Sequence, residues 1–511
     1  MDKKRIIGII LGAMLIVAIV VIAIVSDIVK DKNSNQTIVE ESKTSNSTFL
    51  ADYNGEDASW DDSIAEHITL NGSTASSDKN NVTIDNNLVK ITKEGIYVFE
   101  GNFNGQIQVE TDVKIRIILN GVEIISQDGP AIYVVNAEKV YITAVDGTEN
   151  KLTDTTNYTD QEPTATIYSK DDLIFNGTGK LNVIGNYQDG IVSKDDLKIW
   201  NGNIVVEAMN NGIKGKDSVK VVDGNINIKA KNDGIKTTND TDKTKGYILI
   251  SGGNIKIEAS HDGIQAQTIL NIEGGTIDIV SGEGSNSSNV STTTNDMFFI
   301  RGQWGQQSNT FATEEDSGSY KGIKASGNIV ISGGEITIDS ADDGIHSNSD
   351  INISQGTITV DSGDDAIHAD GLLQIDGGNL TLNVHEGLEA TFVKINNGTI
   401  SITASDDGIN AGNKSNAYTT TIEINGGNIS INMGQGDTDA IDSNGNIYIN
   451  GGTINITAQS AFDYDGEAKY SGGELIVNGT KTTSITNQFG GQMRGQQMPQ
   501  GGQMYGGPRG I

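Results

Sequence analysis

A short corner motif recurs about every 22 residues through most of this chain. In each copy an acidic or polar residue is followed by Gly or Ala and then by an aliphatic residue, and Ala461-Phe462-Asp463 is a degenerate last copy. A fixed period in this range is typical of a solenoid, in which each repeat stacks on its neighbours. The ten regular copies begin at Asp189, Asn211, Asp233, Asp262, Lys321, Asp343, Asp365, Glu386, Asp407 and Asp439.

Three short strand signals accompany each corner. In the segment 328–338, Ile and Val alternate with other residues, and the turn Ser332-Gly333-Gly334 separates two such runs. Strict alternation places the aliphatic side chains on one face of each strand. Glycine pairs supply turns that need positive φ, and the chain has only 4 prolines, as expected where every strand pairs on both sides.

These features predict an all-β fold, a right-handed parallel β-helix with about 22 residues per coil. A propeller would need hairpin blades of roughly 40 residues, and a leucine-rich repeat its own Asn/Leu consensus. We expect an N-terminal cap and first coils at 61–165 and the β-helix at 166–485, with an insertion at 282–320. Insertions in solenoids map to surface loops, often on the binding face.

The N-terminal residues 6–25 form an uninterrupted apolar run that is long enough to span a bilayer. The basic segment 1–5 before it indicates a cytoplasmic N-terminus. We interpret the run as an uncleaved transmembrane signal-anchor rather than a cleaved signal peptide, because no clear small-x-small cleavage site follows. A linker at 26–60 and a disordered Gly/Gln/Met tail at 486–511 would flank the fold. The expected location is extracellular, at the cell surface, held to the plasma membrane by one helix.

Composition limits both the partners and the source of stability. The chain has no cysteine, so the solenoid core must supply the stability without disulfides. The net charge of −32 excludes nucleic acid and anionic surfaces as partners. An acidic polysaccharide would need a divalent cation to bridge it to the protein.

The corner acids should form a column, with Asp343 and Asp365 about 4.8 Å apart at the backbone. Bare carboxylates at that distance repel by about 1 kcal/mol in water and about 3.5 kcal/mol at an effective dielectric of 20. Ca²⁺ takes six to eight oxygens in irregular geometry, so doubled acids on successive coils indicate calcium sites. The alternative is that Asp precedes Gly simply because it favours turns. The expected metal ligands are Asp342, Asp343, Asp364, Asp365, Glu389, Asp406, Asp407, Asp437, Asp439 and Asp442.

The residue three positions after each corner acid should point outward, in a column that runs from basic residues to Asp442 and Tyr464. A polysaccharide lyase needs a base for the proton beside a uronate carboxylate, with calcium to acidify that proton. Lys324 or a neutral His346 or His368 could serve, and both histidines are also candidate ligand-binding residues. The alternative is that these are ordinary solvated side chains.

Trp200 precedes Asn201-Gly202 on a turn where other coils carry small polar residues. An exposed indole there would be a platform for sugar stacking. Packing under a neighbouring loop is an equal alternative.

Several longer motifs occur in a fixed order along 82–477. In this order and spacing the chain resembles the clostridial-type carbohydrate-binding domain-containing proteins, parallel β-helices similar in fold to calcium-dependent pectate lyases. The motifs are Glu94-Gly95-Ile96-Tyr97-Val98, Leu119-Asn120-Gly121-Val122, Asp128-Gly129-Pro130-Ala131-Ile132-Tyr133, Ser169-Lys170-Asp171-Asp172-Leu173 and Gly185-Asn186-Tyr187-Gln188-Asp189-Gly190-Ile191.

The resemblance implies polysaccharide binding at the cell surface, calcium sites on the coil and no established catalysis. The expected function is therefore binding of a pectin- or cellulose-like glycan by a monomer with a calcium-stabilised β-helix. One alternative is a calcium-dependent pectate lyase. Another is a structural or adhesive surface rod that binds a protein partner through the insertion and the tail.

Overall fold

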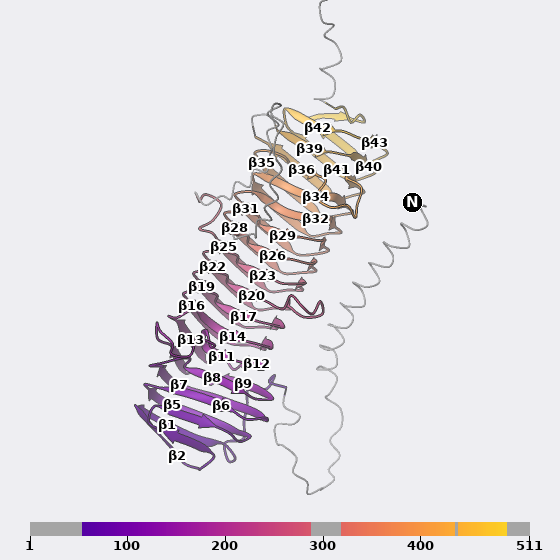
Figure 1. Ribbon diagram of the computed structural model, residues 1–511. Coiled ribbons are helices and arrows are strands. Elements are labelled where there is room, and N and C mark those ends of the chain that lie inside the picture. Colours follow the sequence, from indigo (N-terminus) through magenta and orange to yellow (C-terminus); the bar gives the residue numbers. More distant parts are fainter. Residues whose placement is uncertain (1–53, 288–317, 435–437, 488–511) are drawn as a thin grey trace, which may run out of the picture.

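The structure is a computed structural model that describes residues 54–287, 318–434 and 438–487. In these ranges it is a β-helix of 45 strands without a helix, stacked as a rod from the indigo N-terminal end to the yellow C-terminal end (Figure 1). Nearly all strand pairs are parallel, and in the regular coils each strand pairs with the third strand after it, as β14 pairs with β17 and β17 with β20. The predicted parallel β-helix is confirmed, and its right-handed sense stays a prediction.

Three ladders of strands make up the coils. The corner ladder contains β4 (Leu88–Ile91), β6 (Gln106–Glu110), β8 (Ile132–Asn136), β11 (Ala165–Ser169), β14 (Asp189–Ser193), β17 (Ile213–Gly215), β20 (Ile235–Thr237), β23 (Ile264–Ala266), β26 (Ile323–Ala325), β29 (Ile345–Ser347), β36 (Ile409–Ala411), β39 (Asp439–Ser443) and β42 (Ser460–Tyr464). The second ladder contains β9 (Lys139–Ala144), β12 (Leu173–Asn176), β15 (Asp196–Ile199), β18 (Ser218–Val221), β21 (Tyr247–Ile250), β24 (Leu270–Ile272), β27 (Ile329–Ile331), β30 (Ile351–Ile353), β37 (Thr421–Ile424), β40 (Asn446–Ile449) and β43 (Ala468–Tyr470). β32 (Asp365–Ile375) and β34 (Glu386–Ile395) run through both ladders.

The third ladder contains β10 (Glu149–Thr153), β13 (Lys180–Gly185), β16 (Asn203–Ala208), β19 (Asn225–Ala230), β22 (Asn254–Ala259), β25 (Thr276–Ser281), β28 (Glu335–Ser340), β31 (Thr357–Ser362), β33 (Asn379–Val384), β35 (Thr399–Ala404), β38 (Asn428–Met433), β41 (Thr453–Thr457) and β44 (Glu474–Val477). Longer strands begin the helix, namely β1 (Glu66–Gly72), β5 (Gly95–Phe103) and β7 (Lys114–Ile125). The antiparallel pairings involve β2 (Thr74–Ser77), β3 (Val82–Asp85) and β45 (Thr480–Thr482), close to the two ends.

The core is a continuous stack of aliphatic side chains. The corner Ile of one coil lies on the corner Ile of the next, and Ile323, Ile345 and Ile367 are fully buried in register. Because alternate residues of each strand point outward, the same register aligns the outward side chains into columns. The fold thereby fixes the spacing of every polar column on the surface.

One corner is shifted by a residue from the sequence interpretation. The register pairs Ile441 with Phe462 and Asp442 with Asp463, so the last corner begins at Ser460 rather than at Ala461. The bulky Phe462 takes the inward place of Ile and is buried. The outward residue of this coil is therefore Asp463 and not Tyr464, which extends the acidic part of the column by one coil.

The first described residues lie against the coils. Arg116 is buried and donates hydrogen bonds to the carbonyl oxygens of Ser59 (2.7 Å) and Asp57 (3.2 Å). Asn176 donates to the carbonyl oxygen of Gly55 (2.6 Å). The segment 54–60, at the end of the expected linker, is thus held to the β-helix. The expected signal-anchor at 6–25 lies outside the described residues, and the described ranges contain no helix that is apolar and long enough to cross a bilayer.

Candidate functional site

The outward column of the corner ladder brings together most of the candidate residues. Adjacent strands pair Lys324 with His346, His346 with His368 and His368 with Glu389. The column continues through Asn410 to Asp442. The predicted alignment of these residues one coil apart is confirmed.

A lysine occupies the space between the first pair of doubled acids. The Lys321 Nζ atom lies 2.8 Å from Asp342 Oδ2 and 2.8 Å from Asp343 Oδ2. All three side chains are buried or nearly so, with 14%, 8% and 3% of their surfaces exposed. Although burial opposes ionisation of Asp343, the Lys321 charge and a hydrogen bond to His346 hold its pKa well below the ordinary value.

This ammonium is an alternative to calcium at Asp342 and Asp343, where calcium stays a prediction although the carboxylates of Asp342, Asp343 and Asp364 lie within 4.8 Å of one another. A cation already lies within hydrogen-bonding distance of both carboxylates, and it comes from the corner position of the preceding coil. Asp364, on the next coil, has its pKa raised to about 6 by burial and by the charges of Asp343 and Asp342. The acidic pair is therefore an internal salt bridge of the folded chain.

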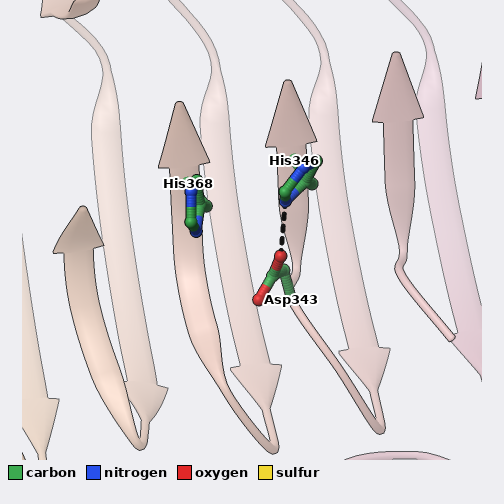
Figure 2. A group of neighbouring side chains, drawn as sticks. All are labelled: Asp343, His346 and His368. Atoms are coloured by element: carbon green, nitrogen blue, oxygen red, sulfur yellow. Dashed lines mark hydrogen bonds and ion pairs between the residues drawn. The ribbon is translucent and has the colours of Figure 1, made fainter. Parts of the chain in front are cut away.

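Two histidine rings stack beside this salt bridge. The rings of His346 and His368 have centroids 4.7 Å apart and are tilted by 37°. Figure 2 shows the two rings on neighbouring strands, with the His346 ring directed at Asp343. His346 Nδ1 lies 2.6 Å from Asp343 Oδ2, and Nε2 lies 3.0 Å from Asn348 Oδ1. Both ring nitrogens of His346 are thus engaged within the protein.

His368 lies between two buried carboxylates. Its Nδ1 atom is 2.7 Å from Asp365 Oδ2 and 2.9 Å from Glu389 Oε2, and Nε2 is 3.5 Å from Asp370 Oδ1. Burial opposes its charge, but these carboxylates raise the pKa of His368 well above the usual value. In turn, against the effect of burial, His368 and Lys414 lower the pKa of Glu389 to about 2.

The candidate lyase bases make contacts within the protein in this arrangement. A raised pKa keeps the His368 imidazole protonated near neutral pH, so it is a cation rather than the neutral base that was expected. Lys324 Nζ lies 3.0 Å from Ser319 Oγ and 3.7 Å from Asp262 Oδ2. Lys324, His346 and His368 each contact acidic or polar neighbours.

A second group of acids lies further along the corner ladder. Unlike Asp342 and Asp343, these acids have no cationic side chain paired with them in the described residues. Burial, together with the charges of nearby acids, raises the pKa of Glu386 to about 7, of Asp407 to about 8 and of Asp442 to about 6. Carboxylate or ring atoms of His385, Glu386 and Asp406 lie within 4.8 Å of one another. Within the described ranges no ion pair involves Glu386, Asp406, Asp407 or Asp442. Asp406, Asp407 and Asp442 of this group were expected as metal ligands, and Glu386 was not.

Two further expected ligands have different surroundings. Asp439 accepts a hydrogen bond from the Ser460 hydroxyl. Its backbone N–H donates to Asp407 Oδ1 over 3.1 Å, which ties two corner acids of successive coils together. Asp437 lies outside the described residues.

Trp200 is not an exposed platform. The side chain is buried against Tyr141 and Ile174, and only 8% of the residue surface is exposed. Its Nε1–H donates to the Asn54 carbonyl oxygen over 3.0 Å, and Lys198 Nζ lies 3.5 Å from the ring centroid. Because the segment at Asn54 covers the turn, the packing interpretation holds and the sugar-stacking one does not.

The Trp200→Leu substitution should therefore lower stability without affecting ligand binding. Loss of ring contacts and of the bond to Asn54 should cost about 2 kcal/mol in the free energy of unfolding. Denaturant unfolding measures this loss of stability. Binding of the same variant to polysaccharide tests whether ligand binding is unchanged. Weakened binding by a fully folded variant would restore the stacking role.

Three residues of this site were missed from sequence. The repeat carries a signal for two of them. Lys321 replaces the acid at a corner position, and Asp463 follows Phe462. Lys414 belongs to the excursion after Ala411 and reaches back to place Nζ 3.0 Å from Glu389 Oε1. The repeat carries no signal for that contact, because the excursion breaks its period.

Comparisons with known proteins agree with the resemblance predicted from sequence. The model of the carbohydrate-binding domain-containing protein family matches residues 85–366 and 364–493, and the chain belongs to this family. A carbohydrate-binding domain-containing protein of Acetivibrio thermocellus is 44% identical over 128 residues, which are 24% of this chain and 45% of that protein. The match thus spans less than half the length of that curated relative.

A solved structure shares part of the sequence as well. It is described as the polysaccharide lyase-like protein from C. thermocellum, as a gadolinium derivative. It is 37% identical to this chain, with a TM-score of 0.40, and the match covers 42% of this chain and 94% of that protein.

Proposed function

We propose that this chain binds polysaccharide on the outer surface of its β-helix. The observation that carries the proposal is membership of the carbohydrate-binding domain-containing family, whose model covers most of the described coils. A pectin- or cellulose-like glycan is the proposed ligand, bound by a monomer. A rod of stacked coils suits an extended polymer, because its surface repeats along one axis at the strand spacing of about 4.8 Å.

Calcium is the proposed cofactor, and its proposed position is the second acidic group. Glu386, Asp406, Asp407 and Asp442 offer carboxylate oxygens from successive coils, and none of them forms an ion pair with a lysine of the described residues. Hard oxygen ligands in irregular arrangement suit Ca²⁺ better than Mg²⁺, which demands a near-ideal octahedron. Calcium bound there would supply positive charge that stabilises the crowded acids.

The proposed location is the cell surface. The apolar run at 6–25 and the basic residues before it support this proposal, in which one helix anchors the chain to the plasma membrane and the β-helix lies outside. No observation on the described residues favours a lyase activity, and most of the insertion and the tail, on which the protein-binding rod depends, lie outside the described residues.

A pull-down with insoluble polysaccharides tests the proposal. The full chain is incubated with cellulose and with covalently cross-linked pectin, and the bound fraction is measured in Ca²⁺ and in chelator. We expect binding to at least one of the two polymers above that of an unrelated protein of similar charge. Absence of binding to both, with the protein folded, would refute the proposal.

A further inference from the structure

One face of four coils near the C-terminal end of the β-helix is uniformly polar and uncharged. It is formed by the three outward residues of β33, β35, β38 and β41, all of which are exposed. We call it the polar face, and it consists of Asn379, Thr381, Asn383, Thr399, Ser401, Thr403, Asn428, Ser430, Asn432, Thr453, Asn455 and Thr457. The register aligns these side chains in three columns across four coils.

The same ladder is charged further toward the N-terminus. Its outward, exposed positions in β16, β19, β22, β25 and β28 include Glu207, Lys229, Lys256, Glu258, Asp278 and Glu335. Since these coils accept charges of both signs at equivalent positions, the fold does not require neutral residues there. The neutrality of the polar face is thus a property of those four coils alone, in a chain whose net charge is −32.

The side chains of the polar face are available for a ligand. Among the twelve, only Asn383 makes a side-chain hydrogen bond to another described residue, by donating to Asp361 Oδ1 over 3.2 Å. The other hydroxyl and amide groups project from the sheet without a partner in the described part of the chain. Each can both donate and accept, as the hydroxyl groups of a sugar do.

We infer that the polar face is the surface on which the chain binds polysaccharide, and that this polysaccharide is uncharged. The inference rests on the proposed function and deepens it. A neutral glycan matches a face without charge, whereas a polyanion would meet repulsion from the acids of the neighbouring corner ladder. Four coils and three outward positions span roughly 14 Å by 14 Å, which accommodates a few sugar rings in a row. The second segment matched by the family model contains the whole face.

Two double variants test this inference, and each adds two lysines, so that they have the same net charge. Ser401→Lys/Ser430→Lys places two charges at the centre of the face, and Asn227→Lys/Thr337→Lys places two in the same column on charged coils. Lys256 is native in that column, so the strands accept lysine. The full chain and both variants are titrated onto insoluble cellulose, and thermal unfolding checks that all three are folded.

We expect the first variant to bind cellulose about tenfold more weakly than the unmodified chain, because a charge buried under a neutral ligand has no partner. The second variant should bind as the unmodified chain does. Equal binding by the folded first variant would overturn the assignment of the face while leaving polysaccharide binding intact. Binding to pectin alone would overturn the inference that the ligand is uncharged. Binding to no polysaccharide would overturn both that inference and the proposed function. If the first variant loses self-association but still binds cellulose as the unmodified chain does, the polar face is instead a contact between two copies of this chain.

Discussion

The Lys321→Met variant should lose about 3–5 kcal/mol of its free energy of unfolding, because one cation neutralises two buried acids. Methionine keeps most of the side-chain length but leaves Asp342 and Asp343 buried without the ammonium that lies 2.8 Å from each. His346 remains beside Asp343 and compensates only part of the lost charge. Unfolding in denaturant, monitored at neutral pH, measures the difference.

Two further variants test whether the loss comes from the uncompensated charges of Asp342 and Asp343. Lys229→Met removes a lysine whose Nζ atom lies 3.6 Å from Glu258 with both side chains largely exposed, and it should cost less than about 1 kcal/mol. Lys321→Met combined with Asp342→Asn and Asp343→Asn should recover most of the loss, because the uncompensated charges are gone. If Lys321→Met costs no more than Lys229→Met, the internal salt bridge does not stabilise the coil.

Stability in chelator should fall as the pH rises from about 5 to 8.5. Glu386, Asp407 and Asp442 have raised pKa values, about 7, 8 and 6, so the folded chain holds their protons more tightly than the unfolded chain does. Where the folded state binds more protons, the free energy of unfolding decreases with pH. The raised pKa of His368 acts in the same direction, since stability from its protonated form is lost on passing through that pKa. Glu389, with a pKa of about 2, titrates below this window.

Calcium should reverse this loss at high pH and have little effect at low pH. Its proposed ligands are carboxylates that must be deprotonated, and the raised pKa values of Glu386, Asp407 and Asp442 keep these three protonated in the folded chain at pH 5. At a free Ca²⁺ concentration about 100 times Kd, the gain at pH 8.5 should be about 2.7 kcal/mol. Thermal unfolding at both pH values, with Ca²⁺ or chelator, measures the effect.

A matched pair of variants assigns the effect to the second acidic group. Asp407→Asn should flatten the pH dependence and reduce the gain from calcium, while its amide oxygen can still accept from Asp439 N–H. Asp278→Asn, in an exposed position of β25, should leave both unchanged. A calcium gain that is the same in all three proteins would place the ion elsewhere, and no gain at all would remove calcium from the account.

The columns could be predicted from sequence because the coil has a fixed period. Once Ile345 and Ile367 are recognised as equivalent, alternation also aligns His346 with His368 and the acids beside them. In the sequence interpretation the last corner is misplaced by one residue, because the large aromatic Phe462 stands where other coils have Ile, although the register itself is regular. The match to the family could likewise be predicted, since its motifs lie in the regular part of the chain.

The electrostatics of the site could not be predicted in the same way. A column of acids in sequence does not say which carboxylates are already compensated, and that depends on side chains that reach across coils. Lys321 stands at a corner position yet lies against two acids of the next coil. Trp200 is covered by residues near Asn54, almost 150 positions earlier in the chain. Such contacts depend on tertiary packing and have no period.

Electrophoresis of the folded full chain through native gels tests the central claim most directly. Parallel gels contain no polysaccharide, a soluble cellulose derivative without charge, or pectin, each with Ca²⁺ and with chelator. The account predicts that a polysaccharide slows the chain relative to a non-binding reference protein, and that the uncharged polymer does so even in chelator. Equal mobility in every gel would contradict the claim that this β-helix binds polysaccharide.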